Sequence, residues 1–262
     1  MMRSAPPRPK GSAQLDRLRA KIRAIEPHAL AAPQGAQPCR APGELLHLQP
    51  GLHEICPAEY LDTPAALAVQ TGFMAMHLRT SERRPPLVWV RPADGRGQDF
   101  GQPYPLALKA WGLKPDEVLL AEASDMADAL WAMEEALRTG AWLIGEIGQA
   151  SQYDLTRSKR LNLAARDCGG LALLLRSHLT ASPSAALSRW RISARPSQAE
   201  AWRGATGLPG LGHPRYRAQL ERVKGGPPAD FDIEWRNAAF HVLKPAPLAQ
   251  RAAQPDPIAL SA

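Results

Sequence analysis

The sequence is poor in cysteine and contains no long apolar run. Its three cysteines, Cys39, Cys56 and Cys168, lie far apart and form neither a C-x-x-C pair nor a metal-ligand spacing with the seven histidines. We therefore expect no disulfide framework and no metal site, and we interpret the cysteines as small buried hydrophobic residues. No apolar run reaches the roughly 20 residues of a membrane span, so we expect no membrane contact. The opening stretch, MMRSAPPRPKGSAQ, lacks the apolar region of a secretory signal, which leaves the cytoplasm as the expected compartment.

Lysine is scarce beside arginine: the chain has 7 Lys and 25 Arg, with a net charge of +7. Guanidinium groups bind phosphate and carboxylate through paired hydrogen bonds, so one interpretation is a nucleic acid or an acidic protein as partner. The other interpretation is a GC-rich genome, which exchanges Lys codons for Arg codons and also enriches Ala, Pro and Gly. Composition alone does not separate the two.

A phosphate-binding turn is missing at a place where the flanking pattern predicts one. The stretch GLHEICPAEYLDTPAALAVQ, residues 51–70, predicts a strand, a turn and a helix that begins at Asp62-Thr63-Pro64. A P-loop turn reads G-x-x-x-x-G-K-[ST]. Residues 56–63 read CPAEYLDT, with no glycine and no lysine. The turn therefore lacks the bare backbone and the cation that a phosphate cradle needs.

The residues that occupy this turn oppose a polyphosphate through bulk and charge. Tyr60 and Leu61 carry bulk where the backbone must be bare, and Glu59 and Asp62 carry negative charge. We expect Asp62 or Thr63 to cap the following helix, with Pro64 at the first helical position. The predicted degenerate nucleotide site consists of Glu59, Tyr60, Asp62 and Thr63, and we expect no cofactor.

The chain divides into three predicted parts. Residues 1–44 predict a disordered N-terminus with one short amphipathic helix, whose apolar stripe is Leu15, Leu18, Ile22 and Ile25, followed by a Pro/Ala-rich linker. Residues 45–245 predict the folded core, and residues 246–262 a flexible tail.

Strand-like and helical segments alternate in the first part of the core, which predicts an α/β fold with a mostly parallel sheet and helices on both faces. The clearest helix is SDMADALWAMEEALRTG, with a cap at Ser124 or Asp125, an end at Gly140, and an apolar stripe. The stripe consists of Met126, Leu130, Met133 and Leu137. After Ser177, the segments SRWRISARPS, YRAQLERVKG, DFDIEWRN and AAFHVLKP predict an extension of antiparallel strands.

The order and spacing of these segments resemble the RecA core over about residues 45–245. GLHEI is similar to the strand that enters the RecA P-loop. LALKAWGLKPDEVLLAEASDMADALWAMEEALRTGAWLIGEI resembles the RecA stretch that leads to the Walker B strand. A closer resemblance is to the ImuA family of RecA-like proteins, carried by LWAMEEALRTGA, SKRLNLAARDCGGLALLLR, SAALSRWRISARPS and LERVKGGPPADFDIEW.

The ImuA resemblance implies a RecA-like fold and a role in the SOS mutagenesis that follows DNA damage. It implies ImuB and an error-prone DNA polymerase as partners in translesion synthesis, with RecA, self-association and single-stranded DNA as further options. Such a role would place the protein at the nucleoid.

The RecA resemblance also places two acidic residues. Asp94 lies near the position of the RecA catalytic glutamate, and Glu146 lies near the Walker B position. A Mg²⁺ site needs its carboxylate beside the phosphates and a P-loop hydroxyl. Because the cradle is missing, we interpret Glu146 as structural or as a partner contact, and we expect no ATP hydrolysis.

Three groups of cations are candidates for binding DNA or a partner, and a solvated basic surface is the alternative for each. The resemblance places two of the groups near the DNA loops of RecA. Strand alternation puts Arg189 and Arg191 on one face and Trp190 on the other, in the core. The candidates are Arg157, Lys159 and Arg160 in a helix; Arg189, Arg191 and Arg195 in a strand; and Arg217, Arg222 and Lys224 in the antiparallel extension.

We therefore expect a non-catalytic protein that acts by contact in damage-induced mutagenesis. Two alternatives stay open at this stage. One is a SulA-like stoichiometric inhibitor of the cell-division protein FtsZ. The other is an ATP-dependent, recombinase-like enzyme with an unorthodox nucleotide site.

Overall fold

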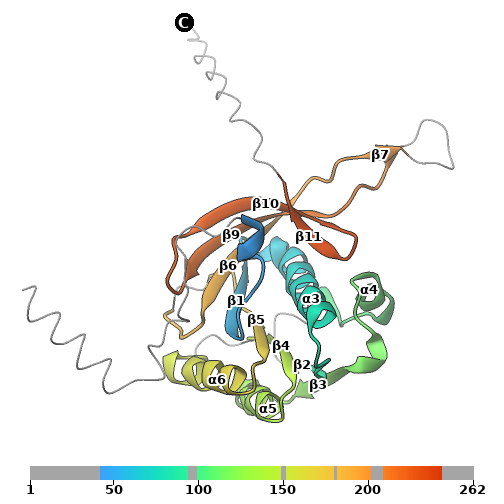
Figure 1. Cartoon of the computed structure of the whole chain (residues 1–262). Coiled ribbons are helices and arrows are strands. Elements are labelled where there is room, and N and C mark those ends of the chain that lie inside the picture. The colour runs from blue at the N-terminus through green and yellow to red at the C-terminus, as the bar shows by residue number, and fades with distance from the viewer. Residues whose placement is uncertain (1–41, 94–98, 149–151, 180–181, 202–208, 244–262) are drawn as a thin grey trace, which may run out of the picture. The chain divides into compact units, whose positions relative to one another are not determined.

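The computed structural model describes residues 42–93, 99–148, 152–179, 182–201 and 209–243. The predicted N-terminal helix, the predicted C-terminal tail, Cys39 and Asp94 lie outside these ranges. A nine-stranded sheet is the centre of the described part, with the strand order β11-β10-β9-β6-β1-β5-β4-β2-β3 (Figure 1). The strands are β1 (Gly51–Pro57), β2 (Leu87–Pro92), β3 (Val118–Ala123), β4 (Trp142–Glu146), β5 (Leu171–Leu175), β6 (Ser188–Arg195), β9 (Arg215–Val223), β10 (Ala229–Arg236) and β11 (Ala239–Val242). A separate two-stranded ribbon joins β7 (Glu200–Ala201) to β8 (Pro209–Gly210).

Strands β1 to β6 are mutually parallel, and β9, β10 and β11 extend the sheet in antiparallel fashion. The predicted mostly parallel sheet with an antiparallel C-terminal extension is therefore confirmed. One detail was wrong, because we expected β6 to belong to the antiparallel group. Strand β6 pairs in parallel with β1 and antiparallel with β9, so it is the strand at which the direction changes.

Helices cover both faces of the parallel strands. They are α2 (Pro42–Leu45), α3 (Thr63–Thr80), α4 (Pro105–Ala110), α5 (Met126–Arg138) and α6 (Leu155–Asp167), with short 3-10 turns η1 (Tyr60–Asp62) and η3 (Pro115–Glu117). Helices α3 and α4 pack on one face, and α5 and α6 pack on the other (Figure 1). None of the helices in the described ranges is long and apolar enough to cross a membrane.

Helix α3 lies in the larger of the two cores. Its Phe73 contacts Trp190 of β6 and Phe240 of β11, with ring centroids 5.5 and 5.4 Å apart. A Cβ atom at Gly72 would lie 2.6 Å from Phe240, so only glycine lets the helix and β11 approach this closely. The antiparallel extension is thus anchored to the parallel sheet through α3.

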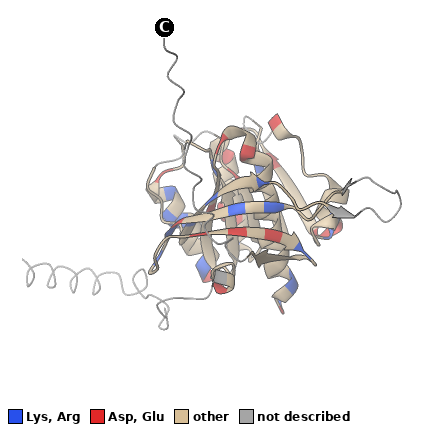
Figure 2. Ribbon diagram, turned by 90° about the horizontal axis from the view of Figure 1, so that it is seen from above, with Lys and Arg blue, Asp and Glu red and all other residues tan. Residues whose placement is uncertain are grey.

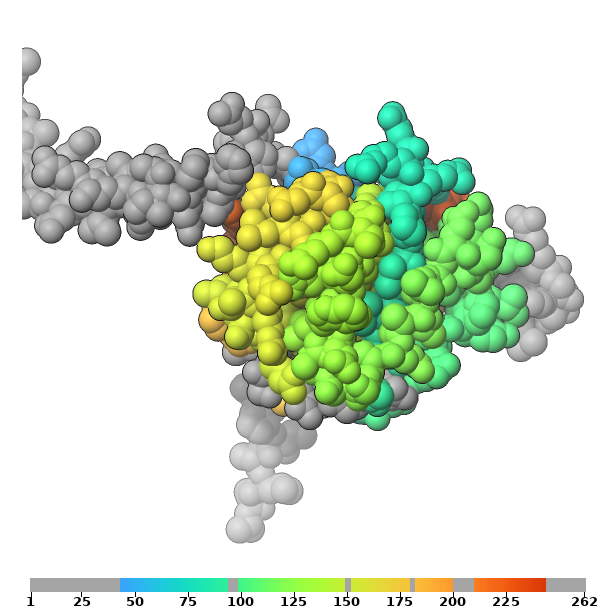
Figure 3. Space-filling view, turned by 90° about the horizontal axis from the view of Figure 1, so that it is seen from below, coloured from blue at the N-terminus to red at the C-terminus, as the bar shows by residue number. Residues whose placement is uncertain are grey.

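Helices α5 and α6 lie side by side on the opposite face (Figure 3). The predicted α5 stripe of Met126, Leu130, Met133 and Leu137 is buried. Asp125 caps α5 by accepting a hydrogen bond from the Asp128 amide at 2.9 Å, and Asp154 caps α6 by accepting from the Arg157 amide at 2.7 Å. The predicted α5 stripe and the predicted cap at Asp125 are therefore confirmed.

Cys56 in β1 is fully buried, and burial raises the pKa of its thiol to about 11. The side chain therefore stays protonated and behaves as the small apolar residue that we expected. Among the described residues, no three His, Cys, Asp or Glu side chains gather in a way that could hold a metal ion.

Candidate functional site

The turn that replaces a P-loop lies where β1 ends and α3 begins. Parallel α/β sheets bind ligands at the carboxyl ends of their strands, so this is the expected place for a nucleotide. The chain leaves β1, forms η1 and enters α3 at Thr63. Asp62 occupies the N-cap position as predicted, but the predicted side-chain cap is wrong.

The Asp62 carboxylate is used elsewhere. It accepts hydrogen bonds from the Ala194 amide of β6 at 2.9 Å and from the Glu59 amide at 3.3 Å. Pro64 is the second residue of α3, not the first, and Thr63 donates its hydroxyl to the Tyr60 carbonyl at 2.6 Å. Asp62 and Thr63 therefore hold the turn in shape and tie it to β6.

The Tyr60 side chain packs against two other rings at the carboxyl ends of the strands. Its ring lies 5.2 Å from that of Phe100 and 6.3 Å from that of His178, and its hydroxyl donates to Asp99 at 2.7 Å. Glu59 beside it is exposed. The bulk and the negative charge that the sequence predicted here are both present at the strand ends.

Little space remains beneath Tyr60. The cavity there has a volume of about 30 Å³ and is lined by residues from the ends of β1, β4 and β5, including Pro57, Glu146 and Arg176. Small-molecule sites in proteins usually measure about 300–1,000 Å³. A nucleoside triphosphate would therefore need Tyr60 and its neighbours to move.

Glu146 at the end of β4 is neutralised from within the protein. Arg91 of β2 lies 2.9 Å from its carboxylate, and the Trp89 indole donates to it at 3.0 Å. Both charged side chains are nearly inaccessible to solvent. Burial raises the pKa of Glu146 above its usual value, although Arg91 opposes the shift. Glu146, the residue near the predicted Walker B position, therefore forms a buried ion pair with Arg91. This contact is consistent with the structural role that we expected for Glu146.

Arg91 was missed by the sequence reasoning. It ends an apolar strand, LVWVRP, so a charged residue at a buried strand end was the available signal. Helix α4, strand β3 and helix α5 lie between it and its partner in the chain, and only strand pairing brings the two together. The register of these two strands places Val90 of β2 opposite Gly145 of β4, and Arg91 and Glu146 are the residues that follow them.

A second buried charge cluster surrounds Glu54 in the middle of β1. Its carboxylate accepts from Arg176 at 2.9 Å, from Arg189 at 2.7 Å and from the Tyr153 hydroxyl at 3.1 Å. Burial alone would raise the pKa of Glu54, but the two guanidiniums outweigh it and hold the pKa below its usual value. Arg176 also stacks on the Tyr153 ring, 4.6 Å from its centroid.

Arg189 and Arg191 lie on the same face of β6 but bind different partners. The predicted alternation is confirmed, with Trp190 only 1% exposed and the flanking Arg189 and Arg191 on the opposite face. Arg189 is bound to Glu54. Arg191 forms an ion pair with Glu221 of β9 and donates to the carbonyls of Pro57 at 3.2 Å and His178 at 3.0 Å.

Opposite charges form rows on the outer face of the antiparallel strands (Figure 2). Arg217 of β9 binds Asp230 of β10 at 2.5 Å, and Arg195 of β6 lies 3.5 Å from Asp232. Arg215 continues the row by binding Glu234 at 2.7 Å. The two candidates in this row, Arg195 and Arg217, are therefore largely neutralised by their neighbours.

The remaining candidates of the extension lie at the far end of β9. Arg222 donates to the carbonyls of Ser184 at 3.0 Å and Ala186 at 3.1 Å, and so holds the connection between β5 and β6. Lys224 follows β9, and its amide donates to the Leu187 carbonyl at 2.7 Å. Arg189 also donates to Ser184, so it meets Arg222 at this connection.

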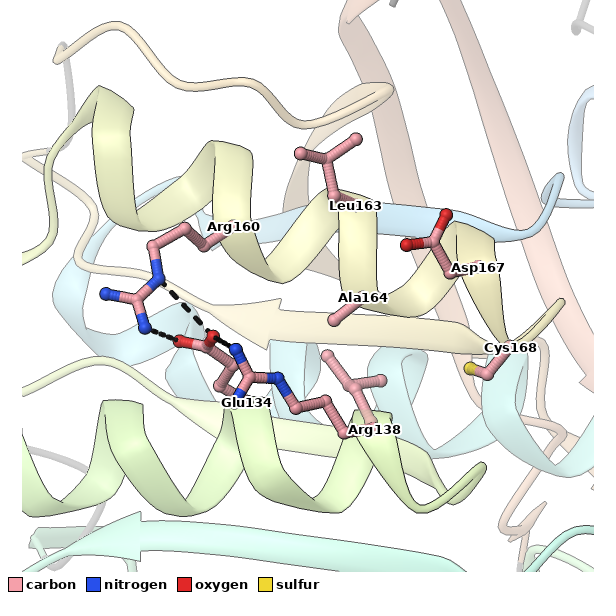
Figure 4. Close-up of a pocket in the computed structure, with 8 residues that line it drawn as sticks. Glu134, Arg138, Arg160, Leu163, Ala164, Asp167 and Cys168 are labelled. Atoms are coloured by element: carbon pink, nitrogen blue, oxygen red, sulfur yellow. Dashed lines mark hydrogen bonds and ion pairs between the residues drawn. The ribbon is translucent and has the colours of Figure 1, made fainter. Parts of the chain in front are cut away.

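The α6 candidates do not share one surface. Arg157 donates to the Gln152 carbonyl, Lys159 is exposed, and Arg160 binds Glu134 of α5 at 2.7 Å. Glu134 also binds Arg138, and the three charges close one end of a groove between α5 and α6 (Figure 4). The groove has a volume of about 430 Å³, with Leu163 and Ala164 on its α6 side.

The candidate cations are therefore dispersed. Arg160 lies at the α5–α6 groove, Arg189, Arg222 and Lys224 at the connection before β6, and Arg195 and Arg217 on the outer face of the antiparallel strands, whereas Arg157, Lys159 and Arg191 lie apart from these three places. Nothing in these contacts tests whether any of them binds DNA or a partner. They stay predictions.

Comparison with known proteins identifies the family. No family model matches the chain. The chain is 30% identical over 204 residues to Protein ImuA of Caulobacter vibrioides strain NA1000, an alignment that covers 72% of this chain and 76% of that protein. Protein ImuA of a second strain of the same species, ATCC 19089, matches at the same identity and coverage. The chain therefore belongs to the ImuA family.

Proposed function

We propose that this chain is a non-catalytic RecA-like accessory protein of the SOS mutagenesis that follows DNA damage. In this role it contacts ImuB, an error-prone DNA polymerase or RecA during translesion synthesis, in the cytoplasm at the nucleoid. Membership of the ImuA family supports the assignment of this chain to the ImuA/ImuB mutagenesis system. The observation that supports a non-catalytic role is the Arg91–Glu146 ion pair at the ends of β2 and β4.

The charges at the strand ends favour a non-catalytic role. Phosphoryl transfer depends on a phosphate cradle, a lysine, and a carboxylate that helps to hold Mg²⁺. Here the turn carries the negative charges of Glu59 and Asp62 in place of a lysine, and the Glu146 carboxylate is already neutralised by Arg91. A divalent cation would have to displace a buried guanidinium, which would then lose its own partner.

We predict that the purified full-length protein hydrolyses no ATP beyond the buffer background, with or without single-stranded DNA. The Thr63→Ala and Glu146→Gln variants should give the same background rate, because neither residue holds a metal or phosphate. A coupled phosphate-release assay with Mg²⁺-ATP measures this. DNA-stimulated hydrolysis that either variant lowers tenfold or more would contradict the proposal.

We also predict that the protein forms a stable complex with purified ImuB from the same genome. Size-exclusion chromatography of the mixture should show co-elution, and residues 1–245 without the tail should report whether the tail contributes. Bovine serum albumin serves as the control for non-specific capture by a basic protein. If neither the full chain nor the shortened chain associates with ImuB, the proposed role beside ImuB is wrong.

A further inference from the structure

The turn that no longer cradles phosphate exposes apolar side chains instead. Leu61 is 80% exposed, Leu179 is 73% exposed and Tyr60 is 39% exposed. The rings of Tyr60 and His178 lie 6.3 Å apart, and each leucine directly follows one of these two residues, so both leucines lie at the same edge of the sheet. We call Tyr60, Leu61, Phe100, His178 and Leu179 the edge patch.

The edge patch is held in a fixed shape. Asp62 ties η1 to β6 through the Ala194 amide, and Arg191 ties the end of β1 to His178 through two carbonyl oxygens. Leu61 therefore precedes a residue that is tied to β6, and Leu179 follows a residue that is held by Arg191. A preorganised apolar surface loses little conformational freedom when a partner covers it.

Carboxylates lie on the side of the edge patch that Tyr60, Leu61 and Phe100 form. Glu59, Asp62 and Asp99 flank it, and in the described part of the chain none of them forms an ion pair with Lys or Arg. Within the described ranges, the two arginines at this edge are both paired, Arg191 with Glu221 and Arg176 with Glu54. Among the described residues, the edge patch therefore has more unpaired carboxylates than unpaired cations beside it, and this charge favours a cationic partner segment.

We propose that the edge patch is the docking surface for ImuB, and that it accepts a segment with a branched-chain or aromatic side chain flanked by Lys or Arg. This inference depends on the proposed function, because it names the surface through which the partner binds. The apolar anchor covers Leu61 and Leu179, and the flanking cations meet Glu59 and Asp99. A solvent-exposed apolar patch with a charged rim is typical of such contacts.

The test measures ImuB binding to full-length protein by biolayer interferometry. The double variant Leu61→Glu with Leu179→Glu should bind at least tenfold more weakly than wild type, because two carboxylates replace the apolar anchors. The matched control is Leu106→Glu with Leu119→Glu, whose leucines are 63% and 64% exposed on α4 and β3. The control should bind within twofold of wild type, and circular dichroism should show all three proteins folded.

A charge variant tests the rim separately. Glu59→Lys should weaken ImuB binding at least threefold at low salt, whereas Glu82→Lys, at an exposed position beyond the end of α3, should not. If wild type binds ImuB and the double leucine variant binds equally well, the edge patch is not the docking surface. If wild type itself does not bind ImuB, the proposed function fails, and this inference fails with it.

Discussion

Replacing Glu54 by Gln is expected to lower the free energy of unfolding by about 3–5 kcal/mol, the largest effect that we predict for a single substitution. The side chain of Glu54 is 0% exposed and so is that of Arg176, while that of Arg189 is 11% exposed. Glutamine keeps the shape but removes the charge, so two guanidiniums lose their shared counterion inside the protein. Urea unfolding at pH 7.5, followed by circular dichroism, measures the change.

The control for this prediction is Glu221→Gln, which removes the partner of Arg191 at the surface. The Glu221 side chain is 34% exposed, so water can take over much of its role, and we expect a loss below about 1 kcal/mol. If both substitutions cost the same small amount, the Glu54 cluster does not stabilise the fold as we infer.

Acidification from pH 6.5 to pH 4 is expected to destabilise the protein by about 3 kcal/mol through His53 alone. His53 is 3% exposed, and burial lowers its pKa from 6.5 to about 4, although the hydrogen bond to the Gln49 carbonyl opposes the shift. Above pH 6.5 the histidine is neutral in the folded and the unfolded state, so the free energy of unfolding carries no penalty from its protonation. Between pH 6.5 and pH 4, His53 binds a proton in the unfolded chain but not in the folded protein, so the free energy of unfolding falls as the pH falls. The decline ends once the pH is below the folded pKa.

His53→Gln isolates this effect. An amide nitrogen can still donate to the Gln49 carbonyl, which the ring now contacts at 2.8 Å, but it does not titrate. Urea unfolding at half-unit pH steps should show that, between pH 6.5 and pH 4, the free energy of unfolding of wild type falls by about 3 kcal/mol more than that of the variant. Thr71→Val, at another buried position, should instead run parallel to wild type. A His53→Gln profile parallel to wild type would falsify the assignment.

Much of the parallel part of the fold was predictable because its signals are local. The α5 stripe from Met126 to Leu137 repeats at helical spacing, and Asp125 and Asp154 act as caps on residues three positions away. The alternation around Trp190 follows from strand geometry. The loss of the phosphate cradle was equally visible, since a P-loop is a contiguous motif.

Helix α3 shows where local reasoning fails. Its middle is buried almost all round, including Gln70, Gly72 and Met76, so it carries no single apolar stripe. The cause lies outside the helix, because the sheet packs on one side and β11 with Trp111 packs on another. Gly72 is required there because of a contact with Phe240, which no spacing within α3 reveals.

The sequence by itself determined the order of strands and helices and the absence of a phosphate-binding turn, because both depend on residues close together in the chain. Only the tertiary structure decided what the charged residues do. Arg91 meets Glu146, and Glu54 meets Arg176 and Arg189, because parallel strands place side chains together that are remote in sequence. Coulomb energy depends on distance in space and on burial, and pairing of the strands sets both.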